Sequence, residues 1–261
     1  MMYMKKVAFL LITILFSIYS VAQNERKKPV YVVYIGNSIT QGALIDQPEK
    51  NAPPIQANLY LSKQKDIDLR GFSNQGVSGM TTVDFLPAQQ TRFPKVVEAA
   101  APFAGDRQAL LVFSVMLGTN DSAIKGPNGS PVSPAQYYTN VKVIIDELFN
   151  LYPKALFVLH RPVWYSPNTY NGSMYLKAGL ERLESYTPEL DKIVQAYAAI
   201  RPNQVYKGDF DAFDFFKANY ATDLVPEEGN AGTFYLHPNT QGAARLGEFW
   251  GKAIYRVVAG K

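Results

Sequence analysis

Few side chains in this sequence suit the roles of nucleophile or general base. The chain has no cysteine, which excludes thiol nucleophiles, thiolate metal sites and disulfides. It has two histidines, His160 and His237, so any mechanism that needs an imidazole must use one of them. A serine hydroxyl is a poor nucleophile until a neighbouring base takes its proton. Serine chemistry in this chain therefore requires a serine within reach of His160 or His237.

Ser38 is the first candidate because of its position. It follows PVYVVYIG (29–36), an apolar run closed by glycine that predicts a buried strand. The surrounding GNSIT does not match the Gly-x-Ser-x-Gly turn of the α/β-hydrolases, because Thr40 stands where the second glycine should be. A serine directly after a strand more often caps a helix. Taken alone, Ser38 is compatible with a capping role or a chemical one.

Three later segments favour the chemical role. NQGVSGMTT (74–82) and MLGTNDS (116–122) each follow a predicted strand, and YLHPNTQGA (235–243) precedes the last predicted helix. Together with GNSIT, and in the same order, they resemble the blocks of the SGNH hydrolases, also called the GDSL esterase/lipase family. The usual Gly-Asp-Ser-Leu is GNSI here. The resemblance covers nearly all of the chain beyond its first 22 residues and implies ester hydrolysis by an acyl-enzyme route.

The resemblance implies roles for four residues. Ser38 is implied as the nucleophile and His237 as the general base. Gly79 and Asn120 are implied as members of the oxyanion hole, together with the backbone N–H of Ser38. These residue types suit the roles, because fixed N–H donors stabilise the negative oxygen of a tetrahedral intermediate. Glycine lets a backbone N–H approach closely, and asparagine supplies a donor that does not titrate.

One position departs from the family's pattern. The family usually carries an aspartate three residues before the histidine, and this sequence has Phe234 there. Phenylalanine cannot accept a proton or hold an imidazole in one tautomer. The sequence leaves three alternatives open: another carboxylate, a backbone carbonyl that orients the ring, or a Ser–His dyad without an acid. The candidate carboxylates are Glu227, Glu228, Asp223 and Asp209.

Other polar residues near these segments have structural explanations. His160 ends the apolar run ALFVLH and is a rival general base, but a histidine at a strand end often only packs and forms hydrogen bonds. We expect Asp121 to brace its loop and Arg161 to be a structural charge. Two distant histidines without a cysteine do not suit a catalytic zinc site. We therefore expect no metal and no cofactor.

The elements that position these residues alternate along the chain. Apolar, β-rich runs predict buried strands, and amphipathic segments between them predict helices. This alternation predicts an α/β fold, a three-layer α/β/α sandwich with a mostly parallel central sheet. The resemblance adds that the sandwich is flavodoxin-like, the SGNH hydrolase fold. We expect strands at 29–36, 66–76, 107–121, 154–163 and 203–209, and helices at 52–64, 81–102, 133–153, 180–200 and 239–259.

The N-terminus has the pattern of a signal peptide at residues 1–22. Lys5 and Lys6 precede an apolar run of 16 residues that ends in a small-x-small sequence. A membrane-spanning helix needs roughly 20 residues. We therefore expect export to the periplasm or the extracellular space, no stable membrane association after cleavage, and a single SGNH/GDSL-type hydrolase domain at 23–261. Without Lys5 and Lys6 the formal charge falls from +4 to +2, and the sequence has no basic run beyond ERKKP (25–29), so a nucleic-acid partner has little support.

The segment 162–178 is the main indication of a substrate. It follows a predicted strand, at the edge where parallel sheets bind ligands. Its aromatic and amide side chains suit sugar rings, or alternatively pack back on the core; they are Trp164, Tyr165, Tyr170, Tyr175, Asn168 and Asn171. With the leader and the resemblance, this loop indicates a carbohydrate O-acetylesterase that acts on a small-molecule or glycan ester. Lysophospholipase, thioesterase and arylesterase activities stay open, as does a degenerate esterase that binds glycans without cleaving them.

Overall fold

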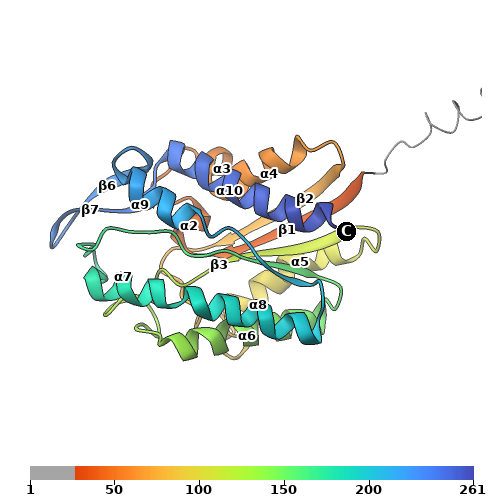
Figure 1. Cartoon of the computed structure of the whole chain (residues 1–261), viewed down its shortest axis with the longest axis horizontal. Coiled ribbons are helices and arrows are strands. Elements are labelled where there is room, and N and C mark those ends of the chain that lie inside the picture. Colours follow the sequence, from red (N-terminus) through yellow and green to blue (C-terminus); the bar gives the residue numbers. More distant parts are fainter. Residues whose placement is uncertain (1–26) are drawn as a thin grey trace, which may run out of the picture.

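The centre of the protein is a five-stranded sheet in which all neighbouring strands are parallel (Figure 1). The computed structural model describes residues 27–261, so the expected signal peptide at 1–22 lies outside the described residues. The strand order is β2-β1-β3-β4-β5. The strands are β1 (Lys28–Gly36), β2 (Ile67–Gly76), β3 (Leu110–Met116), β4 (Leu156–Leu159) and β5 (Val205–Lys207).

The central strands are the continuous apolar runs of the sequence. In β1 the residues from Val32 to Gly36 are all buried, and in β3 so are those from Leu111 to Met116. This is expected of a parallel sheet that is covered on both faces. Aromatic rings fill the space beside β3 and β4, where the ring centroid of Phe157 lies 5.1 Å from that of Phe113. This packed core supports the loops at the edges of the sheet.

Helices cover both faces of the sheet (Figure 1). The helices α4 (Pro53–Ser62) and α10 (Thr240–Ala259) pack against each other in one layer, and α9 (Ala212–Asp223) lies beside α10. The other layer contains α5 (Phe93–Ala104), α6 (Pro134–Leu151) and α8 (Thr187–Ile200). Two rings of β1 mark the opposite faces: Tyr34 stacks on Trp250 of α10, and Tyr31 stacks on Phe103 of α5. The predicted three-layer α/β/α sandwich is confirmed.

Two predicted helices have different bounds in the structure because prolines begin new helices. The segment 81–102 contains the 3₁₀ helix η1 (Pro87–Gln89), and α5 begins only at Phe93. In place of one helix at 180–200 the structure has two, α7 (Leu176–Ser185), which begins four residues earlier than expected, and α8, with Pro188 in its first turn. Proline suits that position, because its missing N–H has no helical acceptor there. Within residues 27–261, no helix is long and apolar enough to span a membrane.

A hairpin that the sequence analysis did not predict lies beyond the carboxyl ends of the parallel strands (Figure 1). It consists of β6 (Leu224–Gly229) and β7 (Gly232–Pro238), which pair antiparallel and form a sheet of their own. Two short helices, α2 (Ser38–Gln41) and α3 (Pro48–Asn51), follow β1. The hairpin and α2 are in contact, so residues from the two ends of the chain meet at this edge.

Candidate active site

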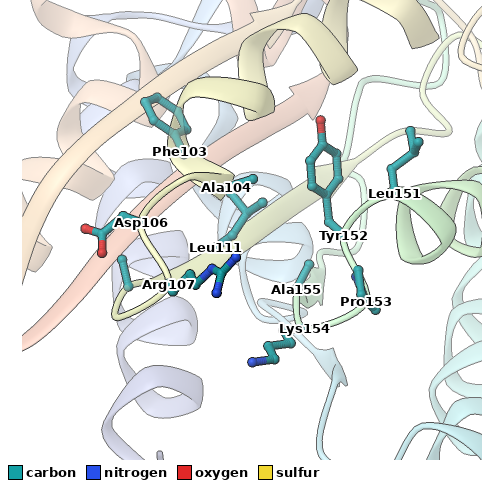
Figure 2. A pocket seen from close by; sticks show the side chains of 11 residues that line it. Phe103, Ala104, Asp106, Arg107, Leu111, Leu151, Tyr152, Pro153, Lys154 and Ala155 are labelled. Atoms are coloured by element: carbon teal, nitrogen blue, oxygen red, sulfur yellow. The ribbon is translucent and has the colours of Figure 1, made fainter.

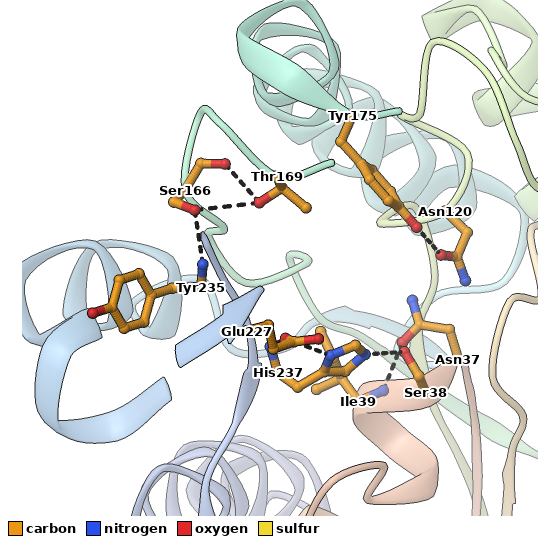
Figure 3. Close-up of polar contacts among 10 residues, drawn as sticks. All are labelled: Asn37, Ser38, Ile39, Asn120, Ser166, Thr169, Tyr175, Glu227, Tyr235 and His237. Atoms are coloured by element: carbon orange, nitrogen blue, oxygen red, sulfur yellow. Dashed lines mark hydrogen bonds and ion pairs between the residues drawn. The ribbon is translucent and has the colours of Figure 1, made fainter. Parts of the chain in front are cut away.

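Ser38 is the first residue of α2, and only Asn37 separates it from the end of β1. The cap of this helix is Asn37, whose side-chain Oδ1 accepts the backbone N–H of Ile39 at 3.1 Å (Figure 3). The Ser38 hydroxyl is therefore free for another partner. The tight turn requires glycine at position 36, because a Cβ on Gly36 would lie 2.0 Å from Oγ1 of Thr40.

The partner of the Ser38 hydroxyl is His237 in β7. The imidazole Nε2 lies 2.9 Å from the Ser38 Oγ (Figure 3). Both side chains are close to buried, with 9% of Ser38 and 11% of the His237 side chain exposed. A hydrogen bond of this length allows an imidazole to take the proton of a hydroxyl.

The carboxylate of Glu227 contacts the other nitrogen of the same imidazole. Its Oε1 lies 2.8 Å from the His237 Nδ1 and also accepts the His237 backbone N–H at 3.2 Å. Glu227 belongs to β6, which pairs with β7, the strand of His237. The residue of β7 opposite Glu227 is Phe234. Phe234 is buried in the hydrophobic core. The carboxylate therefore comes from across the hairpin and not from the position three residues before the histidine.

The other three candidate carboxylates have different partners. Glu228 accepts the hydroxyl of Thr233 at 2.9 Å, and Asp223 accepts the hydroxyl of its neighbour Thr222 at 2.6 Å. Asp209 accepts two backbone N–H groups around the start of α9. The sequence does contain a signal for the hairpin itself, because Gly-Asn-Ala-Gly at 229–232 separates two β-type runs. That signal brings the carboxylates before the turn beside the strand of His237, but it does not select Glu227 over Glu228.

Gly79 and Asn120, the two other residues implied by the family resemblance, line the same cavity as Ser38 and His237. Gly79 has φ of +78°, and a Cβ at this position would meet no atom within 4 Å, so the residue faces open space. The Asn120 amide donates one N–H to the backbone carbonyl of Met80 at 2.8 Å. Its second N–H remains available, so the cavity wall contains donors suited to a negative oxygen.

The cavity that these residues share has a volume of about 310 Å³. Its wall combines hydroxyl and amide groups with small patches of apolar surface. The remaining lining residues are Ala43, Leu44, Ser78, Pro127, Asn171, Ser173, Tyr175, Glu227 and Leu236. This composition suits a small ligand with both polar and apolar parts.

His160 lies outside this cavity and is buried. Its Nδ1 accepts the backbone N–H of Asp209 at 3.0 Å, so its Nε2 carries the proton and donates to the Ser114 Oγ at 2.9 Å. Burial, with a smaller contribution from the charge of Arg256, lowers the pKa of His160 to about 3. The ring is a neutral part of the core and does not contact Ser38.

Asp121 and Arg161 also have structural contacts. The buried carboxylate of Asp121 accepts the backbone N–H of Thr82 at 2.9 Å and also the Thr82 hydroxyl, which ties the segment after β3 to the segment after β2. Burial raises the pKa of Asp121 to about 6. The guanidinium of Arg161 lies 3.6 Å from the ring centroid of Phe213. Neither side chain lines the cavity.

The loop at 162–178 divides between core and cavity. Trp164 and Tyr165 are buried in the hydrophobic core, which agrees with the alternative that the aromatic side chains pack back on it. Asn171, Ser173 and Tyr175 line the cavity. The polar part of the loop, together with one tyrosine, therefore faces the cavity.

The same loop holds the hairpin that carries Glu227 and His237. The Asn168 Nδ2 donates to the carbonyls of Ala231 at 3.2 Å and Thr233 at 2.8 Å. The Ser166 Oγ accepts the backbone N–H of Tyr235 at 2.8 Å (Figure 3). These bonds fix the hairpin over the carboxyl edge of the sheet.

A second cavity of about 310 Å³ lies near the amino ends of β3 and β4 (Figure 2). Its lining contains no serine, threonine or histidine. Its two cations, Arg107 and Lys154, each lie three residues beyond the last residue of α5 and of α6. In the described part of the chain, no group of three or more His, Asp or Glu side chains is arranged to hold a metal ion. Of these two cavities, only the one at Ser38 is lined by a serine and a histidine, the residue types needed for a nucleophile and its base.

Residues 34–245 match the model of the GDSL-like lipase/acylhydrolase family. The chain belongs to this family. The GDSL-like protein is therefore a carboxylic-ester hydrolase, as the four sequence blocks implied. Comparison with curated proteins finds no match.

Solved structures similar to this GDSL-like protein include several esterases. Est24, a carbohydrate acetylesterase from Sinorhizobium meliloti, has 15% identity and a TM-score of 0.56, with 87% of this chain and 99% of that chain covered. The M. smegmatis aryl esterase has 13% identity and a TM-score of 0.56, with the same shares covered. Axe2, an acetylxylan esterase from Geobacillus stearothermophilus, has 16% identity and a TM-score of 0.53, covering 87% and 93%. At these identities the likeness shows a shared fold.

Proposed function

We propose that the protein is an exported esterase that removes short acyl groups, chiefly acetyl, from carbohydrate through an acyl-enzyme on Ser38. The observation that carries the proposal is the hydrogen-bonded series of Ser38, His237 and Glu227. Its two links measure 2.9 Å and 2.8 Å. A hydroxyl, an imidazole and a carboxylate in this order are the parts of a serine-hydrolase triad.

In the proposed mechanism His237 is the general base. Its Nε2 takes the proton of the Ser38 hydroxyl as the oxygen attacks the carbonyl carbon of the ester. The N–H groups of Ser38, Gly79 and Asn120 donate to the negative oxygen of the tetrahedral intermediate. The imidazolium then gives its proton to the leaving alcohol as the C–O bond breaks, which leaves the acyl group on Ser38. Water, deprotonated by the same imidazole, attacks the acyl carbon. The bond from that carbon to the Ser38 Oγ then breaks, the imidazolium returns its proton to Oγ, and the acid is released.

Glu227 supports the base and does not attack the substrate. By accepting the hydrogen bond from Nδ1–H, its carboxylate keeps Nε2 unprotonated toward Ser38 and stabilises the imidazolium that forms. The degenerate glycan-binding alternative depended on a missing acid at Phe234. A carboxylate on His237 removes the reason to prefer that alternative.

The form of the cavity supports a short acyl group and a polar leaving group. Its volume of about 310 Å³ is at the small end of ligand pockets, which span roughly 300–1,000 Å³. Ser78, Asn171 and Ser173 line it with groups that form hydrogen bonds with sugar hydroxyls. Two proteins of the same fold are described as a carbohydrate acetylesterase and an acetylxylan esterase.

The second candidate is an arylesterase. Leu44, Pro127 and Leu236 give the cavity an apolar side against which an aromatic leaving group packs. A protein of the same fold is described as an aryl esterase. The two candidates share the triad and the acyl group and differ in the alcohol that leaves.

Initial rates on a series of esters test the proposal. The panel is p-nitrophenyl esters from acetate to palmitate, acetylated xylo-oligosaccharides and phenyl acetate, each with wild type and Ser38→Ala. We expect kcat/KM to be highest for acetyl esters and higher for the acetylated sugar than for phenyl acetate, and we expect Ser38→Ala to be inactive on all of them. A preference for phenyl acetate selects the arylesterase. Full activity of Ser38→Ala contradicts the acyl-enzyme on Ser38.

Export is tested separately by expressing the full chain in a Gram-negative host. The pattern at residues 1–22 supports cleavage after Ala22. Mass spectrometry of the periplasmic fraction and of the medium should find a chain that begins at Gln23. A full-length chain retained in the cytoplasm or in the membrane contradicts the export proposal and leaves the esterase proposal intact.

A further inference from the structure

The Asn120 side chain has hydrogen-bond partners on both atoms of its amide. Its Nδ2 donates to the backbone carbonyl of Met80 at 2.8 Å, and its Oδ1 lies 2.7 Å from the hydroxyl of Tyr175 (Figure 3). Met80 belongs to the segment after β2, and Tyr175 belongs to the loop at 162–178. Two segments far apart in the sequence therefore meet on one amide in the cavity wall.

The partners determine which way the amide points. A backbone carbonyl only accepts hydrogen bonds, so the nitrogen of Asn120 must face Met80. The oxygen of the amide must then face Tyr175, and the tyrosine hydroxyl must donate its proton to that oxygen. The opposite orientation would set the amide oxygen against the Met80 carbonyl.

We propose that Tyr175 is a positioning residue for ester hydrolysis. Its hydroxyl orients and polarises the Asn120 amide so that the second N–H of this amide donates to the oxyanion. The inference rests on the proposed function, in which Asn120 is an oxyanion-hole member. A proton donated to Oδ1 draws electron density toward the amide oxygen, which makes the N–H groups of the same amide stronger donors. An oxyanion donor acts best when it is fixed before the charge develops.

The surroundings of Tyr175 hold its hydroxyl in this geometry. The residue is 3% exposed, and its ring packs edge-on against the ring of Tyr165 with 5.4 Å between centroids. The backbone N–H of Tyr175 donates to the carbonyl of Thr169 at 3.2 Å. Burial raises the pKa of the Tyr175 hydroxyl to about 12, so the proton is present at every pH at which an esterase is assayed.

A double-mutant cycle tests the proposal. It uses Tyr175→Phe, Asn120→Ala and the double variant, with p-nitrophenyl acetate as substrate. Tyr165→Phe is the matched control, because its hydroxyl is also buried and contacts Ser122 instead of a cavity residue. Thermal unfolding of each variant verifies that it is folded at the assay temperature.

We expect Tyr175→Phe to lower kcat by about ten-fold with little change in KM, because the interaction acts on the transition state. We expect Asn120→Ala to lower kcat by about 100-fold or more. In the Asn120→Ala background, Tyr175→Phe should then have almost no further effect, because the residue through which it acts is gone. Inhibition by phenylboronic acid, which forms a tetrahedral adduct with serine, should weaken in Tyr175→Phe by a similar factor as kcat.

The inference is overturned if Tyr175→Phe slows the enzyme by the same factor with and without Asn120, or if Tyr165→Phe is equally slow. A wild-type rate in Tyr175→Phe also overturns it. Should Tyr175→Phe fail to fold, fluorotyrosine at position 175 keeps the shape and makes the hydroxyl a stronger donor, so a lower kcat in that folded variant contradicts the inference. The Ser38→Ala control separates the two claims: if that variant is active, the proposed function fails, whatever Tyr175 does.

Discussion

Glu227 holds His237 from the neighbouring strand of the β6–β7 hairpin, with one carboxylate oxygen 2.8 Å from the imidazole Nδ1 and 3.2 Å from the backbone nitrogen of the same residue. The two contacts share one oxygen, so the position of the ring and that of the strand are fixed together. In the register of the hairpin, Glu227 pairs with Phe234, whose side chain is in the core. The acid therefore reaches the histidine without any charged group at position 234.

Glu227→Gln should lower kcat by roughly 10² to 10⁴, because the neutral amide no longer stabilises the imidazolium. KM should change little, since the group does not bind the ester. Glu228→Gln is the matched control on the same strand, and its carboxylate bonds only to the exposed Thr233 hydroxyl. Steady-state rates on p-nitrophenyl acetate measure both. Equal losses in the two variants would mean that strand stability, and not the charge on His237, explains the effect.

The two histidines should separate cleanly in activity and stability. His237→Asn removes the base beside Ser38 and should lower kcat by roughly 10⁴ or more. His160→Asn should retain kcat near wild type, because the His160 ring is buried outside the cavity, but should lower the melting temperature. Activity assays and calorimetry on both variants check this. Loss of rate in His160→Asn at full stability would reassign the base.

Sequence patterns predicted the sheet well because each central strand, β1, β3 and β4, is a continuous apolar run. In β1 the run is also closed by Gly36, which the tight turn after the strand requires. The same patterns placed Ser38 just after a strand and His237 just before a helix with strong signals, β1 and α10. That the two side chains act together was implied by the family resemblance and not by these patterns. Local patterns were therefore sufficient for the sheet but not for the pairing of Ser38 with His237.

Neither the identity of the acid beside His237 nor the hydrogen bond from Tyr175 to Asn120 was predictable in the same way. Glu227 reaches His237 through the register of a hairpin, which depends on where the turn falls and not on a fixed spacing. The residue type of Tyr175 indicates either contact with a sugar ring or packing on the core, and neither alternative includes the hydrogen bond from its hydroxyl to Asn120, 55 residues earlier in the chain. Such contacts depend on tertiary packing, which the pattern of residue types within one segment does not predict.

The pH dependence of stability should contain a contribution from His160. Burial lowers the pKa of His160 to about 3 in the folded protein, while an unfolded chain has a histidine pKa of about 6.5. Between these values the unfolded state binds a proton that the folded state does not. The contribution is therefore complete above about pH 6.5 and falls by up to about 1.4 kcal/mol per pH unit as the pH decreases toward 3.

Comparison of wild type with His160→Asn isolates this contribution. Asp121 and Asp209 act in the opposite direction, since burial raises the pKa of each to about 6 and their protonated forms favour the folded state as the pH falls. Both aspartates are present in both proteins, so their effects largely cancel in the difference. Urea unfolding at pH 7 and at pH 4.5 should show a larger stability gap between the two proteins at pH 7. A gap that does not change with pH would contradict a neutral, buried His160.

Asn168 should affect catalysis only through the position of the hairpin. Its amide donates to two carbonyls at the tip of the hairpin, Ala231 and Thr233, and it does not line the cavity. Each such bond contributes about 1 kcal/mol net, so Asn168→Ala should open the hairpin more often and raise hydrogen exchange of the β7 amides. We expect a moderate fall in kcat, less than about ten-fold, because Ser166 still holds Tyr235.

Asn150→Ala is the control, since that exposed amide bonds only to Glu147 on α6. A fall in kcat without faster exchange in β7 would mean that Asn168 contacts the substrate instead, whereas faster exchange with an unchanged kcat would mean that the triad does not need the hairpin tip to be fixed.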